Sequence, residues 1–131
     1  MNRKQKESNL IIPSDKALEE LVVGSFLMDA DLIHSFIQDF SVNLFFSVEC
    51  RAVAECITDL YRKSEAIDII TVSQKARELK KDNIISAYFI SNLTTRLGAT
   101  TNFEYHFRIL QQFALRRNLI QHCGKAVQTA Y

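Results

Sequence analysis

The sequence predicts an all-α fold, with a compact body of about five to six helices that ends in one long C-terminal helix. Three observations lead to this class. Apolar residues recur at spacings of three and four along most of the chain. Only 3 Gly and 1 Pro occur in 131 residues, which is too few turn residues for a sandwich or a barrel. Hydrophobic residues make up 47% and charged residues 24%, the balance of one globular domain with 9 Phe to fill its core.

Residues 1–12 are predicted to form a disordered tail, and residues 13–131 a single helical domain. Residues 1–9 are polar and basic. The apolar run at residues 10–12 stops at Pro13, so it is too short for a secretory signal or a membrane span. The three cysteines form no C-x-x-C pair and are expected to be free thiols. These features predict a cytoplasmic protein that makes no contact with a membrane.

The first helix is predicted to begin beside the only proline, with Ser14 as a cap and Asp15 at the positive end of the helix dipole. Gly24 lies inside this helix, where glycine is less favourable than alanine by about 1 kcal/mol. We therefore expect another helix to approach closely there. Asp29 or Asp31 is then predicted to cap a short second helix.

A third helix is predicted to start at Ser47, after an irregular apolar connector over residues 40–46. Its apolar residues run from Val48 to Tyr61 at spacings of three and four, the mark of an amphipathic helix. Residues 63–65 are expected to end it.

Residues 68–74 read DIITVSQ, and their β-branched side chains would suit a strand. The residues that follow are strong helix formers, and a single strand would have no partner in this chain. Thr71 and Gln74 match the capping box S/T-x-x-E/Q. The segment is therefore predicted to be a helix entered at Thr71, with residues 68–70 as its extended approach.

Two further helices complete the prediction. Residues 86–97 are expected to form a helix that ends at Gly98, and residues 101–104 match a second capping box. The helix over residues 86–97 is expected to face inward with Tyr88, Phe89, Leu93 and Leu97. The second capping box opens the longest apolar pattern of the chain, which comprises Phe103, Phe107, Leu110, Phe113, Ala114, Leu119, Ile120, Cys123 and Val127.

This last pattern is longer than a compact domain of this size needs, since thirty helical residues span about 45 Å. We expect either a break near Gly124 or a helix whose end projects from the body. Arg116 and Arg117 lie on this segment. They suit contact with phosphate or with an acidic partner, and equally a solvated helix face.

No catalytic residue, metal ligand or cofactor site is predicted. The chain has no G-x-x-x-x-G-K-[ST] or G-x-G-x-x-G motif, and its three histidines have no metal-ligand partner at helical spacing. Cys50 or Cys123 is a conceivable nucleophile, but no base or orienting carboxylate stands near either in the sequence. These observations favour an interaction or assembly domain over an enzyme.

Four stretches carry a family resemblance. Residues 13–25 read PSDKALEELVVGS, and residues 45–60 read FFSVECRAVAECITDL. Residues 66–72 read AIDIITV, and residues 102–120 read NFEYHFRILQQFALRRNLI. In this order they resemble the motifs P-x-S/N … E-x-x-V-L-G-S/A, F-Y-x-x-x-H-R … I-x-x-L, P-I-D-x-V-T-V and A-N-x-x-x-Y-A-x-I-V … R-x-L-I. These motifs belong to the N-terminal domain of the DnaB-type replicative DNA helicases, and the resemblance covers about residues 10–131.

Four positions depart from the family pattern. Cys50 stands where the family has histidine, and Ala66 where it has proline. His106 and Phe107 stand where it has tyrosine and alanine. The departures suggest a divergent member.

The resemblance implies a helical head followed by a helical hairpin, of which the chain would contain only the first helix. It implies a non-catalytic collar domain that pairs with other copies of itself, as a dimer or ring within a hexamer, in DNA replication. It further implies docking of a primase and of a helicase loader. ATP and Mg²⁺ would be bound, and DNA contacted, only by a separate motor domain that lies outside this chain.

Two sets of residues receive expected roles. On the projecting helix, contact with a neighbouring subunit or with the second hairpin helix is expected of Arg116, Arg117, Ile120, Cys123, Lys125 and Val127. Structural roles, as caps, in an internal ion pair or in close packing, are expected of Glu19, Gly24, Arg51, Asp68 and Thr71.

Three other interpretations stay open. The helical head-plus-hairpin also resembles the helicase-binding C-terminal domain of a primase, although that domain is expected at the end of a larger chain. A stand-alone adaptor or DNA-binding regulator would use the helix that carries Gln74, Lys75 and Arg77. A small thiol enzyme would use Cys50 or Cys123.

Overall fold

The computed structural model describes residues 11–95 and 102–131. This part of the chain contains six α-helices and one short 3₁₀ helix, and no strand, so the predicted all-α class is confirmed. The elements are α2 (Lys16–Met28), α3 (Asp31–Phe36), η1 (Val42–Leu44), α4 (Val48–Arg62), α5 (Ile69–Glu78), α6 (Ala87–Thr95) and α7 (Phe103–Ala130). None of these helices is both long enough and apolar enough to cross a membrane.

Helix α2 is the centre of the body, because α3, α4, α6 and α7 all pack against it. Phe26 of α2 is fully buried and makes edge contacts with Phe40 and Phe103, with ring centroids 5.1 Å apart in each case. Phe107 of α7 is also fully buried and completes the aromatic cluster. The start of α7 is therefore fixed to the body by burial of aromatic surface.

The N-terminal cap of α2 differs from the predicted one, whereas that of α4 is as predicted. Asp15 caps α2 by accepting from the backbone N–H of Leu18 at 3.1 Å, so the cap is Asp15 and not Ser14. Ser47 caps α4 by accepting from the N–H of Cys50 at 3.2 Å, as predicted. Each hydroxyl or carboxylate satisfies a backbone donor that the first helical turn leaves without a partner.

The start of α5 corrects the prediction. The N-cap is Asp68, whose carboxylate accepts from the N–H of Thr71 at 2.8 Å, while the Thr71 hydroxyl accepts from the N–H of Asp68 at 2.9 Å. Thr71 is thus the third residue of the helix and the second member of the capping box, not its first. The cap lies three residues earlier than predicted and the helix begins at Ile69 instead of Thr71, because Asp is preferred to Thr at the N-cap position.

Helix α6 begins at Ala87, as predicted to within one residue, and the side chains that it buries differ in part from those predicted. Tyr88 is 76% exposed, whereas Ile90 and Leu93 are buried. Phe89 packs partly buried against the core, and Leu97 and Gly98 lie outside the described residues. The predicted Thr101 cap also lies outside them, and the N-cap position of α7 is Asn102.

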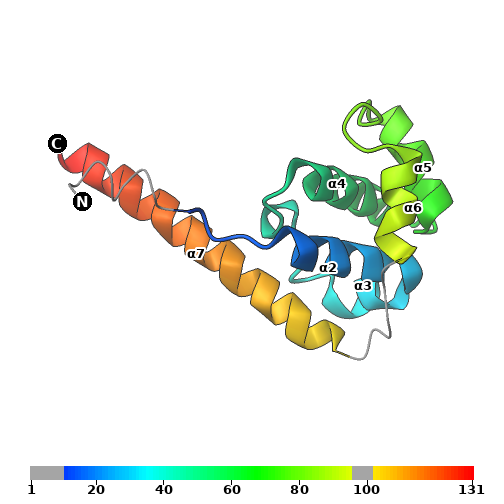
Figure 1. Ribbon diagram of the computed structural model, residues 1–131, viewed down its shortest axis with the longest axis horizontal. Coiled ribbons are helices and arrows are strands. Elements are labelled where there is room, and N and C mark those ends of the chain that lie inside the picture. The colour runs from blue at the N-terminus through cyan, green and yellow to red at the C-terminus, as the bar shows by residue number, and fades with distance from the viewer. Residues whose placement is uncertain (1–10, 96–101) are drawn as a thin grey trace.

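Helix α7 forms an arm. Figure 1 shows it running past α2 and then well beyond the other helices, to the C-terminus at its far end. It has 28 residues, about 42 Å at 1.5 Å per residue. The helix continues through Gly124, at which an added side chain would meet nothing within 4 Å. The expected break is therefore absent, and the alternative expectation, a projecting end, is confirmed.

Candidate interaction surfaces on α7

The N-terminal half of α7 packs on the body of the domain, whereas its C-terminal half is exposed. Its first half is buried against the body through Phe103, Phe107, Leu110 and Ala114. From Asn118 to the end of the chain every residue is exposed. At about 100° per residue, the buried residues lie on one side of the helix.

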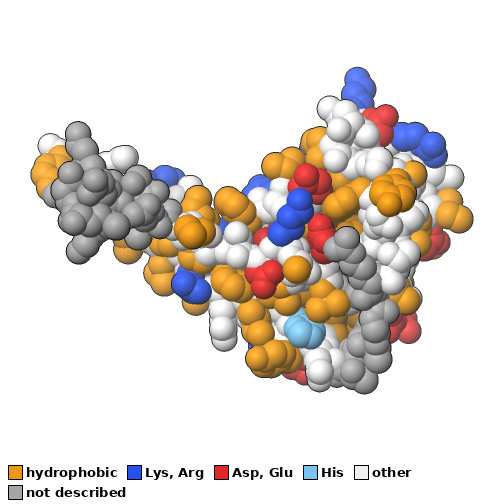
Figure 2. Space-filling model, viewed as in Figure 1, with side chains coloured by type: hydrophobic (Ala, Val, Ile, Leu, Met, Phe, Trp, Pro, Cys, Tyr) orange, Lys and Arg blue, Asp and Glu red, His pale blue; other side chains and the backbone are white. Residues whose placement is uncertain are grey.

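An exposed apolar stripe lies on the other side of the same helix. We call it the α7 stripe, and it comprises Leu115, Leu119, Ile120, Cys123 and Val127. Leu115, Leu119, Ile120 and Val127 are each between 56% and 59% exposed. At about 100° per residue, these positions fall roughly opposite the side that packs on the body. Figure 2 shows patches of hydrophobic side chains on the parts of the arm that are drawn in colour. Four large apolar side chains are thus exposed together on one side of the arm.

The structure divides the six residues predicted to contact a partner. Arg116, Ile120, Cys123 and Val127 share the outward side of α7, while Lys125 falls on a different side by the same helical geometry. The prediction missed Leu115 and did not single out Leu119, although both lie on the stripe. A helical projection starting at Leu110 would have separated the buried side from the outward side.

Arg117 is placed differently from the others, because it faces its own body. Its guanidinium donates to the backbone carbonyls of Pro13 at 3.0 Å, Leu44 at 3.0 Å and Asn43 at 3.4 Å. The same group lies 5.6 Å from the centre of the Phe46 ring. Arg117 therefore fastens the arm to the N-terminal segment and to η1, and its planar fork suits several carbonyls at once.

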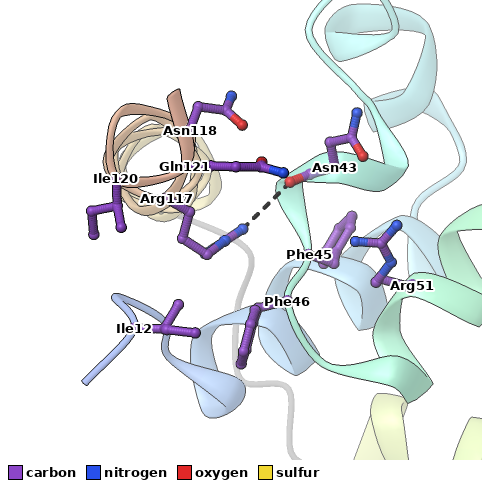
Figure 3. A pocket seen from close by; sticks show the side chains of 9 residues that line it. All are labelled: Ile12, Asn43, Phe45, Phe46, Arg51, Arg117, Asn118, Ile120 and Gln121. Carbon is purple, nitrogen blue, oxygen red and sulfur yellow. Dashed lines mark hydrogen bonds between the residues drawn. The ribbon is translucent and has the colours of Figure 1, made fainter. Parts of the chain in front are cut away.

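A groove lies beside this contact, between α7 and the segment that leads into α4. Figure 3 shows Arg117 and Gln121 pointing from α7 toward Asn43, and Arg51 pointing toward the same region from α4. The groove has a volume of about 340 Å³. Its lining residues are Ile12, Asn43, Phe45, Phe46, Arg51, Arg117, Asn118, Ile120 and Gln121.

The residues predicted to be structural have distinct surroundings. Glu19 is 1% exposed and accepts from the backbone N–H groups of Phe46 at 3.0 Å and Ser47 at 2.9 Å. Gly24 is buried within α2, and the close approach of another helix there stays a prediction. Asp68 and Thr71 form the capping box of α5. Arg51 is exposed and has no ion pair within the described chain, so the expected internal pair does not involve it.

The cysteines have unequal reactivity. Burial raises the pKa of the Cys50 thiol to about 12 and that of the Cys56 thiol to about 11. Both therefore stay protonated at neutral pH, and Cys50 does not fit the role of a nucleophile. Cys123 is exposed on the α7 stripe. Within residues 11–95 and 102–131, no three His, Cys, Asp or Glu side chains gather as metal ligands would.

Lys75, one of the basic side chains that a DNA-recognition helix would use, is not free to contact DNA. Its side chain is 4% exposed, and its ammonium lies 3.0 Å from Asp59 and 2.8 Å from Glu78. Through Asp59 it joins α5 to α4, while Glu78 lies on α5 itself. A recognition helix needs its basic side chains free to reach nucleic acid, so this placement disfavours α5 as one.

Comparison with known proteins identifies the family. The family described as "DnaB-like helicase N terminal domain" matches residues 11–112. Similar relatives are each named replicative DNA helicase DnaB. They come from Rhodothermus marinus (25% identical over 86% of this chain), Treponema pallidum (24% over 92%) and Mycobacterium leprae (28% over 91%). The chain spans only 12%, 28% and 20% of the lengths of these three proteins.

A solved structure has the same fold. It is the crystal structure of the N-terminal domain of DnaB helicase from Mycobacterium tuberculosis, with a TM-score of 0.84 and 26% identity. The match covers 92% of this chain and 85% of that one. The family match over most of the chain and this likeness agree, and the chain belongs to the DnaB-like helicase N-terminal domain family.

Proposed function

We propose that this chain is the non-catalytic N-terminal assembly domain of a replicative DNA helicase. In this role it helps to hold copies of the helicase in a hexameric ring and offers a docking surface to a primase or a helicase loader. ATP, Mg²⁺ and DNA are handled by a motor domain outside this chain. The family membership and the names of the longer relatives support the proposal.

The α7 stripe is the observation that carries the proposal. Apolar side chains on the outward side of a projecting helix gain free energy only when another helix or another subunit covers them. The positions of Leu119, Ile120, Cys123 and Val127 follow helical spacing, which suits a helix lying along the arm. Arg116 lies on the same side of the helix and adds a charged group to this surface.

The test uses the whole product of the reading frame that contains this chain. Native mass spectrometry counts its subunits, and a forked-DNA assay measures ATP-driven unwinding. We expect six copies and unwinding for the unaltered protein. The double substitution Leu119→Glu with Ile120→Glu is expected to break the ring and to abolish unwinding, because it places charge on the contact surface.

Lys125→Glu is the matched control, since it also changes charge on the exposed arm but lies on another side of the helix. It is expected to leave six copies. Circular dichroism checks that each variant stays helical. A reading frame without a G-x-x-x-x-G-K-[ST] motor, or a double variant that still forms six-membered rings, would overturn the proposal.

A further inference from the structure

The groove between α7 and the start of α4 faces the body of the domain, and of the α7 stripe only Ile120 reaches its edge. It is lined by residues from three parts of the chain: the N-terminal segment, the η1–α4 region and the arm. Its volume of about 340 Å³ falls in the range of small-ligand and peptide side-chain pockets. The Arg117 hydrogen bonds to the Asn43 and Leu44 carbonyls hold the two long walls together. The groove is thus a preformed feature of the domain.

The apolar part of the groove is aromatic and aliphatic. Phe45 is fully buried, while Phe46 is 46% exposed and Ile12 is 50% exposed. A Phe side chain left half-exposed beside a hollow can gain from covering by a ligand side chain of similar character. The surface therefore fits one or two large apolar side chains.

The charge in the groove has one sign. Among the described residues, Arg51 and Arg117 are the only ionisable side chains that line it, and no carboxylate does. Arg117 is engaged by three backbone carbonyls, whereas Arg51 makes no ion pair among the described residues. Burial lowers the pKa of Arg117, Glu19 acts to raise it and Arg51 lowers it further. A carboxylate entering the groove would neutralise the positive charge beside Arg117.

Two amide side chains at the edge of the groove add neutral hydrogen-bond donors and acceptors. Gln121 points toward the groove, and Asn118 lies on the preceding turn of the same helix. Both side chains are exposed amides that can pair with the backbone N–H and C=O groups of an extended chain.

We propose that this groove binds an acidic linear peptide segment of a partner protein, in which a large apolar side chain stands next to an Asp or Glu. The carboxylate pairs with Arg51, and the apolar side chain lies against Phe46 and Ile12. This binding site goes beyond ring assembly through α7 and does not depend on it.

Two other occupants fit less well. A nucleic acid strand needs several free cations along its backbone. The described part of the chain offers one free guanidinium in the groove, and the net charge is +1. The first nine residues of this chain carry three basic side chains and one acidic side chain, so their charge matches that of the groove instead of complementing it.

Fluorescence anisotropy with the 131-residue chain tests the proposal. The probes are three labelled octapeptides with the same central Leu-Phe pair, flanked on both sides by Asp, by Asn or by Lys, and a short labelled oligothymidine. The Asp peptide is expected to bind at least about tenfold more tightly than the Asn peptide, because it gains a charge-assisted pair with a guanidinium. Arg51→Gln is expected to remove that difference, and Arg51→Lys to keep part of it.

Arg77→Gln is the matched control, because it removes the same charge from an exposed site on α5 that does not line the groove. It is expected to leave the preference intact. Equal binding of the three peptides, no binding of any peptide up to about 1 mM, or a preference that survives Arg51→Gln would overturn the proposal. Tighter binding of oligothymidine than of the Asp peptide, lost in Arg51→Gln, would assign the groove to nucleic acid and overturn it equally.

Discussion

At the scale of single residues, Glu19 shows how a charged side chain can organise a helical core. Its carboxylate is buried and accepts the N–H groups of Phe46 and Ser47, which lie just before α4. A structural role was expected from the sequence, but its partners were not. They lie 27 and 28 residues away in the chain, and local patterns of three and four residues carry no information on such contacts.

Replacing Glu19 with Gln tests this contact. The amide keeps one acceptor but turns an NH₂ group toward a backbone N–H, so one donor loses its partner. We expect the free energy of unfolding to fall by about 2 kcal/mol, measured by urea denaturation. Glu104→Gln is the control, because that side chain is 69% exposed in a surface ion pair, and it should lower stability by less than about 0.5 kcal/mol. Equal effects of the two substitutions would contradict the assignment.

Arg117 makes a second test possible at this scale. Lysine keeps the charge but has no planar fork, so Arg117→Lys cannot reach the carbonyls of Pro13, Asn43 and Leu44 together. We expect a loss of about 1–2 kcal/mol in the free energy of unfolding. Arg116→Lys, on the exposed side of the same helix, should change it by less than about 0.5 kcal/mol. A loss no greater for Arg117→Lys than for Arg116→Lys would show that the arm is not fastened at this point.

At the scale of the elements, the sequence predicted the helices better than their ends. Residues 71–74 were correctly predicted to be helical, but residues 68–70 were predicted to be extended, whereas Ile69 and Ile70 are helical and the cap is Asp68 instead of Thr71. Both residues suit a cap, and the three-residue spacing of a capping box allows either to be its first member. Asp68 takes this position, because Asp is a better N-cap than Thr.

The contact between α4 and α5 predicts a response to acid. Asp59 lies 3.0 Å from the ammonium of Lys75 and 3.3 Å from that of Lys63. These neighbours, Lys75 first, hold the pKa of Asp59 below its ordinary value of 3.8. A carboxyl group whose pKa is lowered by folding stabilises the fold above its unfolded pKa, and this stabilisation is lost as the pH falls through the folded value.

We therefore expect the melting temperature to fall as the pH drops below about 4, and the fall to be shallower in Asp59→Asn. Asp59→Asn should also melt lower than the unaltered chain at neutral pH, because Lys75 then loses one of its two partners. Asp82→Asn changes an exposed carboxylate outside this network and serves as the control. Parallel melting curves for Asp59→Asn and the unaltered chain across this range would count against the network.

At the scale of the whole molecule, the class of fold and the projecting arm were predictable from the sequence. Which apolar residues of the arm are buried and which are exposed was not. The apolar pattern of α7 was treated as one stripe from Phe103 to Val127. The structure splits it into a buried half and an outward half on opposite sides of the helix. The groove was not predicted at all, since Ile12, Arg51 and Gln121 come together only through tertiary packing.

The central claim is that the α7 stripe is covered in the assembled protein, and Cys123 allows a direct measurement. It is the exposed cysteine of the chain, whereas Cys50 and Cys56 are buried with raised pKa values and should react slowly. The rate of maleimide labelling at Cys123 is compared between the 131-residue chain at high dilution and the full-length product. The account predicts much slower labelling in the full-length protein, because a second helix or subunit covers the stripe. Equally fast labelling in both would contradict it.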